Sequence, residues 1–154
     1  MTKLKEGQEA PFFEGTDQSG NTIKLDDFKG KKLVLYFYPK DNTPGCTNEA
    51  CNLRDNYKDL LAKDFAVVGV SPDSITSHQK FAGKYDLPFP LISDTEKKIM
   101  SDYGVWGEKK IFGKISLGVQ RTTFIIDEKG IIEKIIKKVD TKEHTDQIYK
   151  VYEQ

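Results

Sequence analysis

A strand-to-helix turn that ends at Cys46 constrains this chain more than any other stretch. Residues 33–37 form an apolar run that predicts a buried strand, and residues 46–61 carry apolar side chains at helical spacing. Thr43 is a favourable N-cap residue, and Pro44 then takes the first helical position, where its missing N–H costs nothing. Cys46 is therefore predicted in the first turn of a helix, where unpaired N–H groups and the positive end of the helix dipole favour the reactive thiolate.

A second cysteine, Cys51, follows Cys46 by five positions. On an ideal α-helix, two residues at this spacing have Cα atoms ~8.6 Å apart, whereas a disulfide requires a separation below ~7 Å. The two cysteines therefore cannot bond while both lie in an intact helix, and a reaction between them requires that helix to open. Gly45, Asn48 and Asn52 are poor helix formers, which lowers the free energy of opening.

The rest of the chain alternates predicted strands with predicted helices. Strands are predicted at 12–16, 22–25, 33–37, 65–70, 91–92, 122–126 and 131–137, and helices at 46–61, 74–85, 95–103 and 141–152. The first two strands form an N-terminal hairpin, and the last two a closing one. Residues 104–118 contain four glycines without a clean period and are predicted to be a loop. This pattern predicts an α/β fold, a central mixed β-sheet flanked by helices, within the single domain that residues 1–154 can form.

Composition excludes several classes of partner. Basic and acidic residues both number 24, which gives no reason to expect nucleic acid or an acidic membrane surface as a partner. No apolar run approaches the ~20 residues of a membrane span, and the polar amino end does not resemble a secretory signal. We therefore expect a cytoplasmic protein. In a reducing compartment, two closely spaced cysteines favour redox chemistry or metal binding over a structural disulfide.

The residues around the cysteines resemble a known family. Pro39-x3-Thr43-x2-Cys46 is similar to the peroxiredoxin active-site signature, and Cys46-x4-Cys51 resembles the arrangement in its bacterioferritin comigratory protein, or peroxiredoxin Q, branch. The similarity also includes residues 36–41, 69–71, 103–109 and 121–127, and so covers nearly the whole chain. The resemblance implies a thioredoxin-like fold and a thiol peroxidase that reduces hydrogen peroxide to water and organic hydroperoxides to alcohols.

The resemblance also implies roles for both cysteines. Cys46 matches the peroxidatic cysteine, whose thiolate becomes a sulfenic acid. Cys51 matches the resolving cysteine, which condenses with that acid into an intramolecular Cys46–Cys51 disulfide. Thioredoxin or a similar dithiol would then restore both thiols by exchange. No metal or organic cofactor is implied, and members of this branch are commonly monomeric.

Four further residues match the family's active site. Thr43 resembles the residue whose hydroxyl bonds the reacting oxygens, and Pro39 the residue that shields the thiolate from water. Arg121 matches the arginine that keeps the thiolate charged and aligns the peroxide, tasks that suit its fixed positive charge. Glu49 is similar to a glutamate that orients this arginine.

Two other functions use the same cysteines. A copper carrier on this fold would bind a soft ion through both thiols and a distant histidine, although such carriers prefer a shorter cysteine spacing. A thiol-disulfide oxidoreductase would react without peroxide. Many thioredoxin-like reductases place a cis-proline before the late strand, and residues 119–122 contain no proline.

Several residues also have simpler structural interpretations. Either cysteine could only fill the interior, and Thr43 could serve as an N-cap alone. Pro39 could simply end a strand, and Arg121 could form a surface ion pair. The complete signature favours the functional interpretation.

Outside the signature, four side chains receive structural roles. His78 and His144 are predicted to be solvated, one on a polar helix face and the other in the first turn of the last helix. Trp106 and Phe112 are predicted to cover the core.

Overall fold

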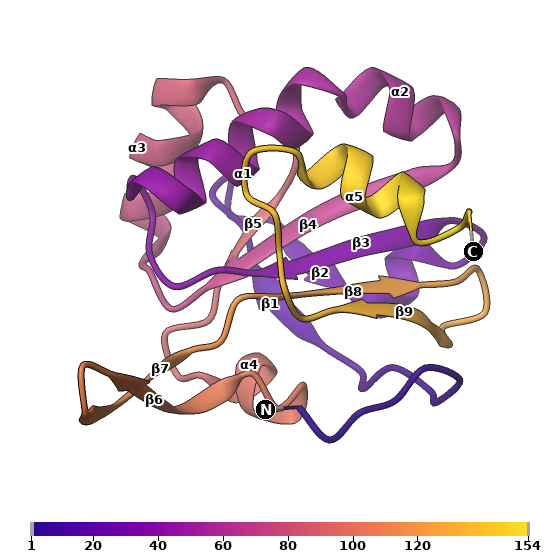
Figure 1. Ribbon diagram of the computed structural model, residues 1–154. Helices are drawn as coiled ribbons and strands as arrows, with labels where there is room; N and C mark the ends of the chain where they lie inside the picture. Colours follow the sequence, from indigo (N-terminus) through magenta and orange to yellow (C-terminus); the bar gives the residue numbers. More distant parts are fainter. Residues whose placement is uncertain (1, 154) are drawn as a thin grey trace.

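A mixed seven-stranded β-sheet forms the centre of the computed structural model, which describes residues 2–153 (Figure 1). Its strands are β1 (Glu14–Thr16), β2 (Thr22–Lys24), β3 (Lys32–Phe37), β4 (Phe65–Ser71), β5 (Leu91–Ser93), β8 (Thr122–Ile126) and β9 (Ile132–Ile136). They lie in the order β2-β1-β5-β4-β3-β8-β9. β3, β4 and β5 run parallel, whereas β8 pairs antiparallel with β3 and β9, and β1 with β2 and β5. The predicted α/β architecture and both predicted hairpins are confirmed.

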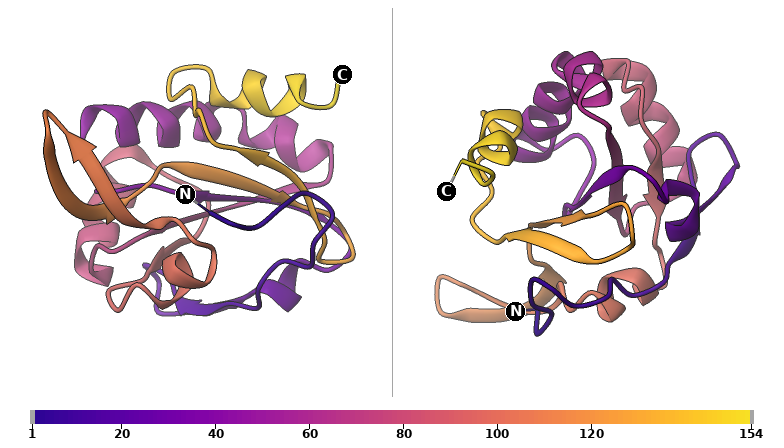
Figure 2. Two further views of the ribbon diagram at one scale, coloured as in Figure 1. Left: turned by 60° about the horizontal axis from the view of Figure 1, so that its bottom comes forward. Right: turned by 90° about the vertical axis from the view of Figure 1, so that its right-hand side faces the viewer.

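Helices cover both faces of the sheet. They are the short 3-10 helix η1 (Leu25–Phe28) and the α-helices α1 (Pro44–Asp55), α2 (Tyr57–Ala62), α3 (Ile75–Tyr85), α4 (Lys98–Asp102) and α5 (His144–Lys150). α1, α2, α3 and α5 lie over one face, and α4 lies under the other (Figures 1 and 2). The sheet is thus the middle layer of a sandwich.

Alternate side chains of β3 enter the two hydrophobic cores on either side of the sheet. Leu33, Leu35 and Phe37 enter one core, and Val34 and Tyr36 enter the other. Side chains in a strand alternate between faces, so a strand covered on both sides needs an unbroken apolar run. Burial of each large apolar side chain contributes ~1.5–3 kcal/mol, which anchors the strand that leads to Cys46.

Three predicted helices differ in their bounds, and the last, predicted at 141–152, spans only His144–Lys150. The segment 46–61 is divided at Asn56, whose side-chain amide donates a hydrogen bond to the Asn52 carbonyl at 2.8 Å and whose backbone (φ −108°, ψ 10°) leaves the helical region. Asparagine competes in this way with regular helix. The helix predicted at 95–103 begins only at Lys98, because Lys97 before it has a left-handed φ of 60°.

The loop prediction for residues 104–118 is wrong. These residues form an antiparallel hairpin of β6 (Trp106–Ile111) and β7 (Lys114–Val119) that extends from the body of the molecule (Figures 1 and 2). Its turn residues, Phe112 and Gly113, both have positive φ, at 52° and 78°. Such turns usually carry Asn-Gly or Asp-Gly, so the sequence lacked the ordinary signal. Phe112 is fully exposed, contrary to its predicted core role, whereas Trp106 packs against the core as predicted.

Both histidines are buried, contrary to prediction. The His78 ring places Nδ1 2.7 Å from an Asp41 carboxylate oxygen and Nε2 3.1 Å from the Ile92 carbonyl. Asp41 also accepts hydrogen bonds from the Tyr38 and Ser77 hydroxyls. These bonds tie the loop between β3 and α1 to α3, and so fix the segment that precedes Cys46.

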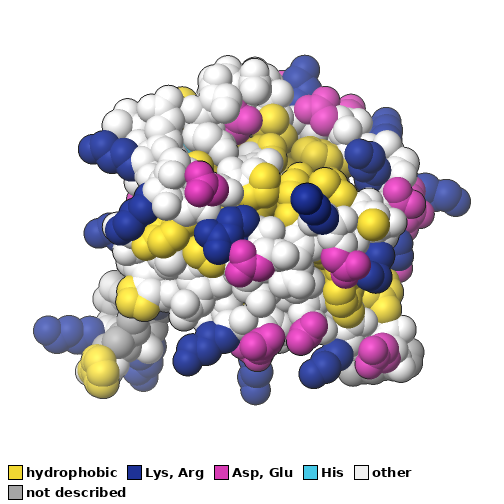
Figure 3. Space-filling model, turned by 90° about the horizontal axis from the view of Figure 1, so that it is seen from above, with side chains coloured by type: hydrophobic (Ala, Val, Ile, Leu, Met, Phe, Trp, Pro, Cys, Tyr) yellow, Lys and Arg dark blue, Asp and Glu magenta, His cyan; other side chains and the backbone are white. Residues whose placement is uncertain are grey.

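Charges of both signs are interspersed over the helix-covered face (Figure 3). This mixture agrees with the balanced composition and gives the face no single charge. No helix within residues 2–153 has both the length and the apolar character needed to cross a membrane.

Candidate active site

Cys46 lies in the first turn of α1, as predicted. Thr43 takes the N-cap position with extended backbone angles (φ −97°, ψ 157°), and Pro44 opens the helix. The Cys46 side chain turns into the core beneath α1, and the residue exposes 1% of its surface. The sulfur is therefore held away from bulk water at the positive end of a helix.

Arg121 brings a fixed positive charge to this sulfur. It lies just before β8, and its Nη2 donates a hydrogen bond to Cys46 Sγ at 3.2 Å. Its Nη1 donates to Glu49 Oε1 at 2.7 Å. Burial lowers the pKa of Arg121, but Glu49 and Cys46 outweigh this effect and raise it overall, so the guanidinium stays charged. A cation and a helix terminus together favour a thiolate.

Gly45 allows this close approach. A Cβ atom at position 45 would lie 3.2 Å from Arg121 Nη2, closer than ordinary van der Waals contact. A side chain there would require the guanidinium beside the sulfur to shift by a few tenths of an ångström.

Glu49 is fully buried, although it is an acidic residue. Burial raises the pKa of its carboxyl to about 7, against the opposing effect of the Arg121 charge. Glu49 faces Arg121 from the same helix that carries Cys46, so it fixes one end of the guanidinium while the other contacts the sulfur. This geometry suits the predicted orienting role.

Thr43 and Pro39 lie in the loop that enters α1. The Thr43 hydroxyl donates to the Lys40 carbonyl at 2.9 Å and makes no capping hydrogen bond, so this residue supplies the N-cap position without the side-chain cap. Pro39 is half-buried after the end of β3. Both are near Cys46 in the chain.

Cys51 lies farther along the same helix, half-buried, with a free thiol. Burial raises the pKa of this thiol; the Arg54 charge opposes the shift and Asp55 adds to it. Cys51 is therefore a protonated thiol near neutral pH. Because α1 is continuous across both cysteines, their Cα atoms are separated by ~8.6 Å in regular helical geometry.

Two residues near the site were missed by the sequence analysis. His144 Nε2 lies 3.4 Å from Glu49 Oε2, and both side chains are fully buried. Burial and the Arg121 charge lower the pKa of Lys109 in β6, against the opposing effect of Cys46. Lys109 is therefore a second cation whose charge acts on the sulfur. No local signal marked either residue, because each reaches the site through tertiary packing.

The structure gives no support to the copper-carrier alternative. Among the described residues, the group of potential metal ligands is formed by Asp41, Asp73 and His78 and includes neither cysteine. These side chains also hydrogen-bond to one another and to the backbone.

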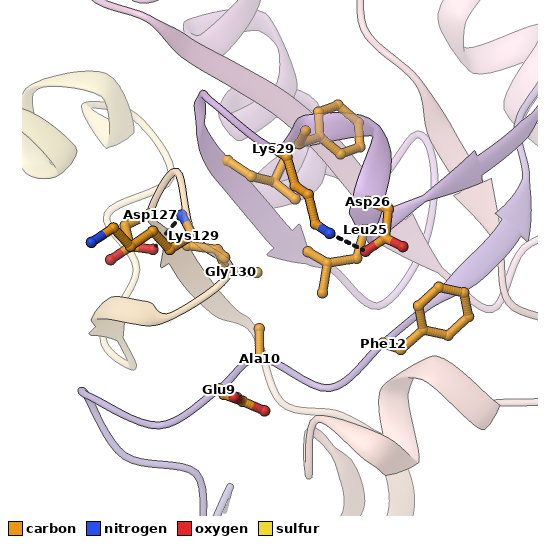
Figure 4. A pocket seen from close by; sticks show the side chains of 12 residues that line it. Glu9, Ala10, Phe12, Leu25, Asp26, Lys29, Asp127, Lys129 and Gly130 are labelled. Atoms are coloured by element: carbon orange, nitrogen blue, oxygen red, sulfur yellow. Dashed lines mark hydrogen bonds and ion pairs between the residues drawn. The ribbon is translucent and has the colours of Figure 1, made fainter.

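The cavity in Figure 4 lies at the end of the sheet away from Cys46. It has a volume of about 340 Å³ and is lined by the N-terminal segment, η1 and the β8–β9 turn. Leu33, at the start of β3, lines it, whereas Cys46 follows the end of that strand. Lys29 and Asp26 form a 3.9 Å ion pair at its edge. None of the predicted catalytic residues lines this cavity.

Comparison with known proteins identifies the family. The AhpC/TSA family profile matches residues 6–135. The chain belongs to this family. Peroxiredoxin Bcp of Bacillus subtilis is 49% identical over 138 residues, which cover 90% of this chain and 88% of that protein. Peroxiredoxin Bcp of Escherichia coli is 42% identical over 146 residues, covering 95% and 94%.

Solved structures lead to the same family. Peroxiredoxin Q of Xanthomonas campestris superposes with a TM-score of 0.88 at 32% identity and covers 96% of each chain. A PrxQ structure from Xylella fastidiosa gives 0.90 at 28% identity and covers both chains fully. These findings confirm the thioredoxin-like fold and the peroxiredoxin Q resemblance. This AhpC/TSA family member is a thiol peroxidase, with a peroxide as substrate and a thiol as reductant.

Proposed function

We propose that this chain is a thioredoxin-dependent, atypical two-cysteine peroxiredoxin in which residues 1–154 act as one domain and Cys46 is the peroxidatic cysteine. The contact between Arg121 Nη2 and Cys46 Sγ at 3.2 Å carries the proposal. It gives the sulfur of a helix N-terminus a fixed, delocalised positive charge. We further propose that Glu49 orients this guanidinium.

In the first step, the Cys46 thiolate attacks the terminal oxygen of the peroxide. The S–O bond forms as the O–O bond breaks, and the remaining oxygen leaves with the electron pair and takes up a proton to become water or an alcohol. Negative charge moves from sulfur onto the breaking O–O bond, so donors fixed along that line stabilise the transition state more than the ground state. Arg121 supplies such donors, and the Thr43 hydroxyl would exchange its bond to the Lys40 carbonyl for one to the peroxide.

Burial of the sulfur suits this chemistry. Cys46 exposes 1% of its surface, so the thiolate loses little reactivity to hydration. Pro39, half-buried in the loop before α1, would contribute to this shielding. Hydrogen peroxide and organic hydroperoxides are the proposed substrates. The bacterioferritin comigratory protein of Xanthomonas campestris, 31% identical, has a described alkyl peroxide reduction activity.

In the second step, Cys51 sulfur attacks the sulfenic sulfur of Cys46 and expels water, which gives the Cys46–Cys51 disulfide. The separation of ~8.6 Å in an intact helix exceeds the ~7 Å limit for a disulfide, so α1 must open first. Because burial raises its pKa, Cys51 stays a thiol and does not compete for peroxide.

A dithiol reductant of the thioredoxin type then attacks the disulfide and restores both thiols. We propose that the cycle runs in the cytoplasm, where such reductants are maintained. We also propose a monomer, since one chain carries both cysteines, Arg121 and Glu49.

Peroxide turnover coupled to thioredoxin, thioredoxin reductase and NADPH tests this proposal. Cys46→Ser should abolish consumption of hydrogen peroxide and of cumene hydroperoxide. Cys51→Ser should consume one equivalent and then stop, with an unchanged rate of first oxidation followed through Trp106 fluorescence. Near-normal turnover by Cys46→Ser would contradict the assignment. Oxidation no faster than that of free cysteine would instead favour the thiol-disulfide oxidoreductase.

A further inference from the structure

The second carboxylate oxygen of Glu49 is an unexplained feature of the site. Oε1 accepts the hydrogen bond from Arg121, but Oε2 is buried and has no hydrogen-bond partner among residues 2–153. A buried polar atom without a partner is unfavourable and calls for an explanation. His144 Nε2 lies 3.4 Å from Oε2.

Hydrogen bonds around His144 define which ring nitrogen carries the proton. Its Nδ1 lies 2.9 Å from the side-chain oxygen of Gln147. That oxygen also accepts the Asp140 backbone N–H, while the Gln147 amide nitrogen donates to the Lys138 carbonyl, so the amide orientation is fixed. An amide oxygen only accepts, so Nδ1 must donate. In the neutral ring, Nε2 is then an acceptor.

His144 therefore offers Glu49 Oε2 no hydrogen-bond donor. The Thr123 hydroxyl lies 2.9 Å from Nε2 and donates to its lone pair. An ionised Oε2 would lie 3.4 Å from this acceptor nitrogen with no donor of its own, which is unfavourable in the core. Burial raises the pKa of Glu49 to about 7 and lowers the pKa of His144 to about 4, so below pH 7 the proton resides on Glu49 and the His144 ring is neutral.

We propose that His144 is a positioning residue for the peroxide reaction: it leaves the buried Glu49 Oε2 without a donor and thereby sets how much of the Arg121 charge is available to Cys46. When Glu49 is neutral, the guanidinium charge acts mainly on the sulfur. When Glu49 loses the proton, its carboxylate competes for that charge. This inference rests on the proposed role of Cys46.

Charged and titratable groups face this pair from every side of the site. They are Arg121 before β8, Cys46 in α1, Tyr36 in β3, Lys109 in β6, which acts on Arg121 and Cys46, and, toward His144, Asp140 before α5. Tyr36 has a pKa raised far above neutrality by burial, and Arg121 stays charged, so neither changes charge near pH 7. A fall in rate near pH 7 that disappears in Glu49→Gln is therefore assigned to the Glu49–His144 pair.

The test is the pH profile of single-turnover oxidation of the full chain by hydrogen peroxide. We expect the rate constant to fall above about pH 7 as Glu49 ionises, and this fall to be absent in Glu49→Gln. His144→Gln places an amide N–H near Oε2, which favours the carboxylate. It should therefore move the fall to lower pH and slow oxidation at pH 7 by about threefold or more, because Arg121 is then partly neutralised.

A double-mutant cycle decides whether His144 acts through Glu49. In the Glu49→Gln background, His144→Gln should have no further effect on the rate or the profile. Thr145→Val, a neighbouring change in α5, controls for helix docking and should leave the profile unmoved. An unmoved profile in His144→Gln, or equal losses in both backgrounds, would overturn the inference. Provided Cys46→Ser still abolishes oxidation, the proposed function would survive either result.

Discussion

At the scale of single residues, the site depends on one guanidinium that donates in two directions. Arg121 contacts Cys46 Sγ through Nη2 and Glu49 Oε1 through Nη1. The planar fork of arginine presents both donors at fixed angles, which the single ammonium of lysine does not. Gly45 provides the space for this group, because a Cβ there would lie 3.2 Å from Nη2.

Gly45→Ala should separate stability from activity. The added methyl group shifts the guanidinium beside the sulfur by a few tenths of an ångström and weakens its charged hydrogen bond, so we expect peroxide oxidation to slow by about tenfold. Alanine also replaces glycine within a helix, which should raise the free energy of unfolding by up to ~1 kcal/mol. Stopped-flow oxidation and urea denaturation measure the two effects.

Gly83→Ala is the matched control for this prediction. Gly83 lies in α3, and a Cβ there would meet nothing within 4 Å. The variant should gain similar stability and keep the wild-type oxidation rate. If Gly45→Ala also keeps that rate, close approach of Arg121 to the sulfur is unimportant.

At the scale of elements, α1 is bound to α5 through Asn52, the residue after the proposed resolving cysteine. The Asn52 side chain donates to the Lys142 carbonyl at 3.0 Å and accepts the Thr145 backbone N–H at 2.8 Å. These bonds hold the helix segment that must open before the cysteines can meet. Contact with α5 therefore opposes disulfide formation.

Asn52→Ala should accelerate the resolving step. Loss of its side-chain hydrogen bonds should lower the free energy of unfolding by ~1–2 kcal/mol and make opening of α1 easier. In stopped-flow fluorescence, the first phase of the peroxide reaction should be unchanged and the disulfide-forming phase faster. An unchanged second phase would show that α5 does not restrain the opening.

Asn48→Ala provides a comparison of opposite sign. Asn48 is exposed between the two cysteines, and alanine there raises helix propensity by roughly 0.5 kcal/mol. The disulfide-forming phase should therefore become slower by about twofold.

At the scale of the whole molecule, the Glu49–His144 contact joins α1 to α5 through two titratable groups whose pKa values shift in opposite directions. Burial raises the pKa of Glu49 from 4.5 to about 7, so its contribution to stability is full below pH 4.5 and is lost as pH rises toward 7. Burial lowers the pKa of His144 from 6.5 to about 4, so its contribution is present above pH 6.5 and is lost as pH falls toward 4. The two dependences oppose each other between these limits.

Replacement of one of the two groups should expose the pH dependence of stability that the other contributes. As pH rises from 4.5 to 6.5, the free energy of unfolding of Glu49→Gln should increase relative to that of wild type. The increase should be about 3 kcal/mol, because each unit of pKa is worth about 1.4 kcal/mol. The free energy of unfolding of His144→Gln should decrease relative to that of wild type as pH rises over the same range. Urea denaturation at several pH values measures both; parallel curves for all three proteins would show that the pair does not control stability.

Sequence patterns predicted much of the fold. Periodicity located β3, α3 and the β8–β9 hairpin, because local geometry and burial agree there. It missed the β6–β7 hairpin, because Phe112 adopts a positive φ that its residue type does not predict. It also placed His78 and His144 in solvent, because helical spacing identifies a face but not the partner that packs on it.

By itself, the sequence determined that Cys46 begins a helix, because an N-cap position, a proline at the first helical position and a preceding buried strand act over a few residues. Only the tertiary structure decided the charge around that sulfur. Arg121 is 75 positions away and arrives through the pairing of β8 with β3, and His144 arrives on the last helix. Electrostatic fields depend on distance in space, and that distance is set by how strands and helices pack rather than by their order in the chain.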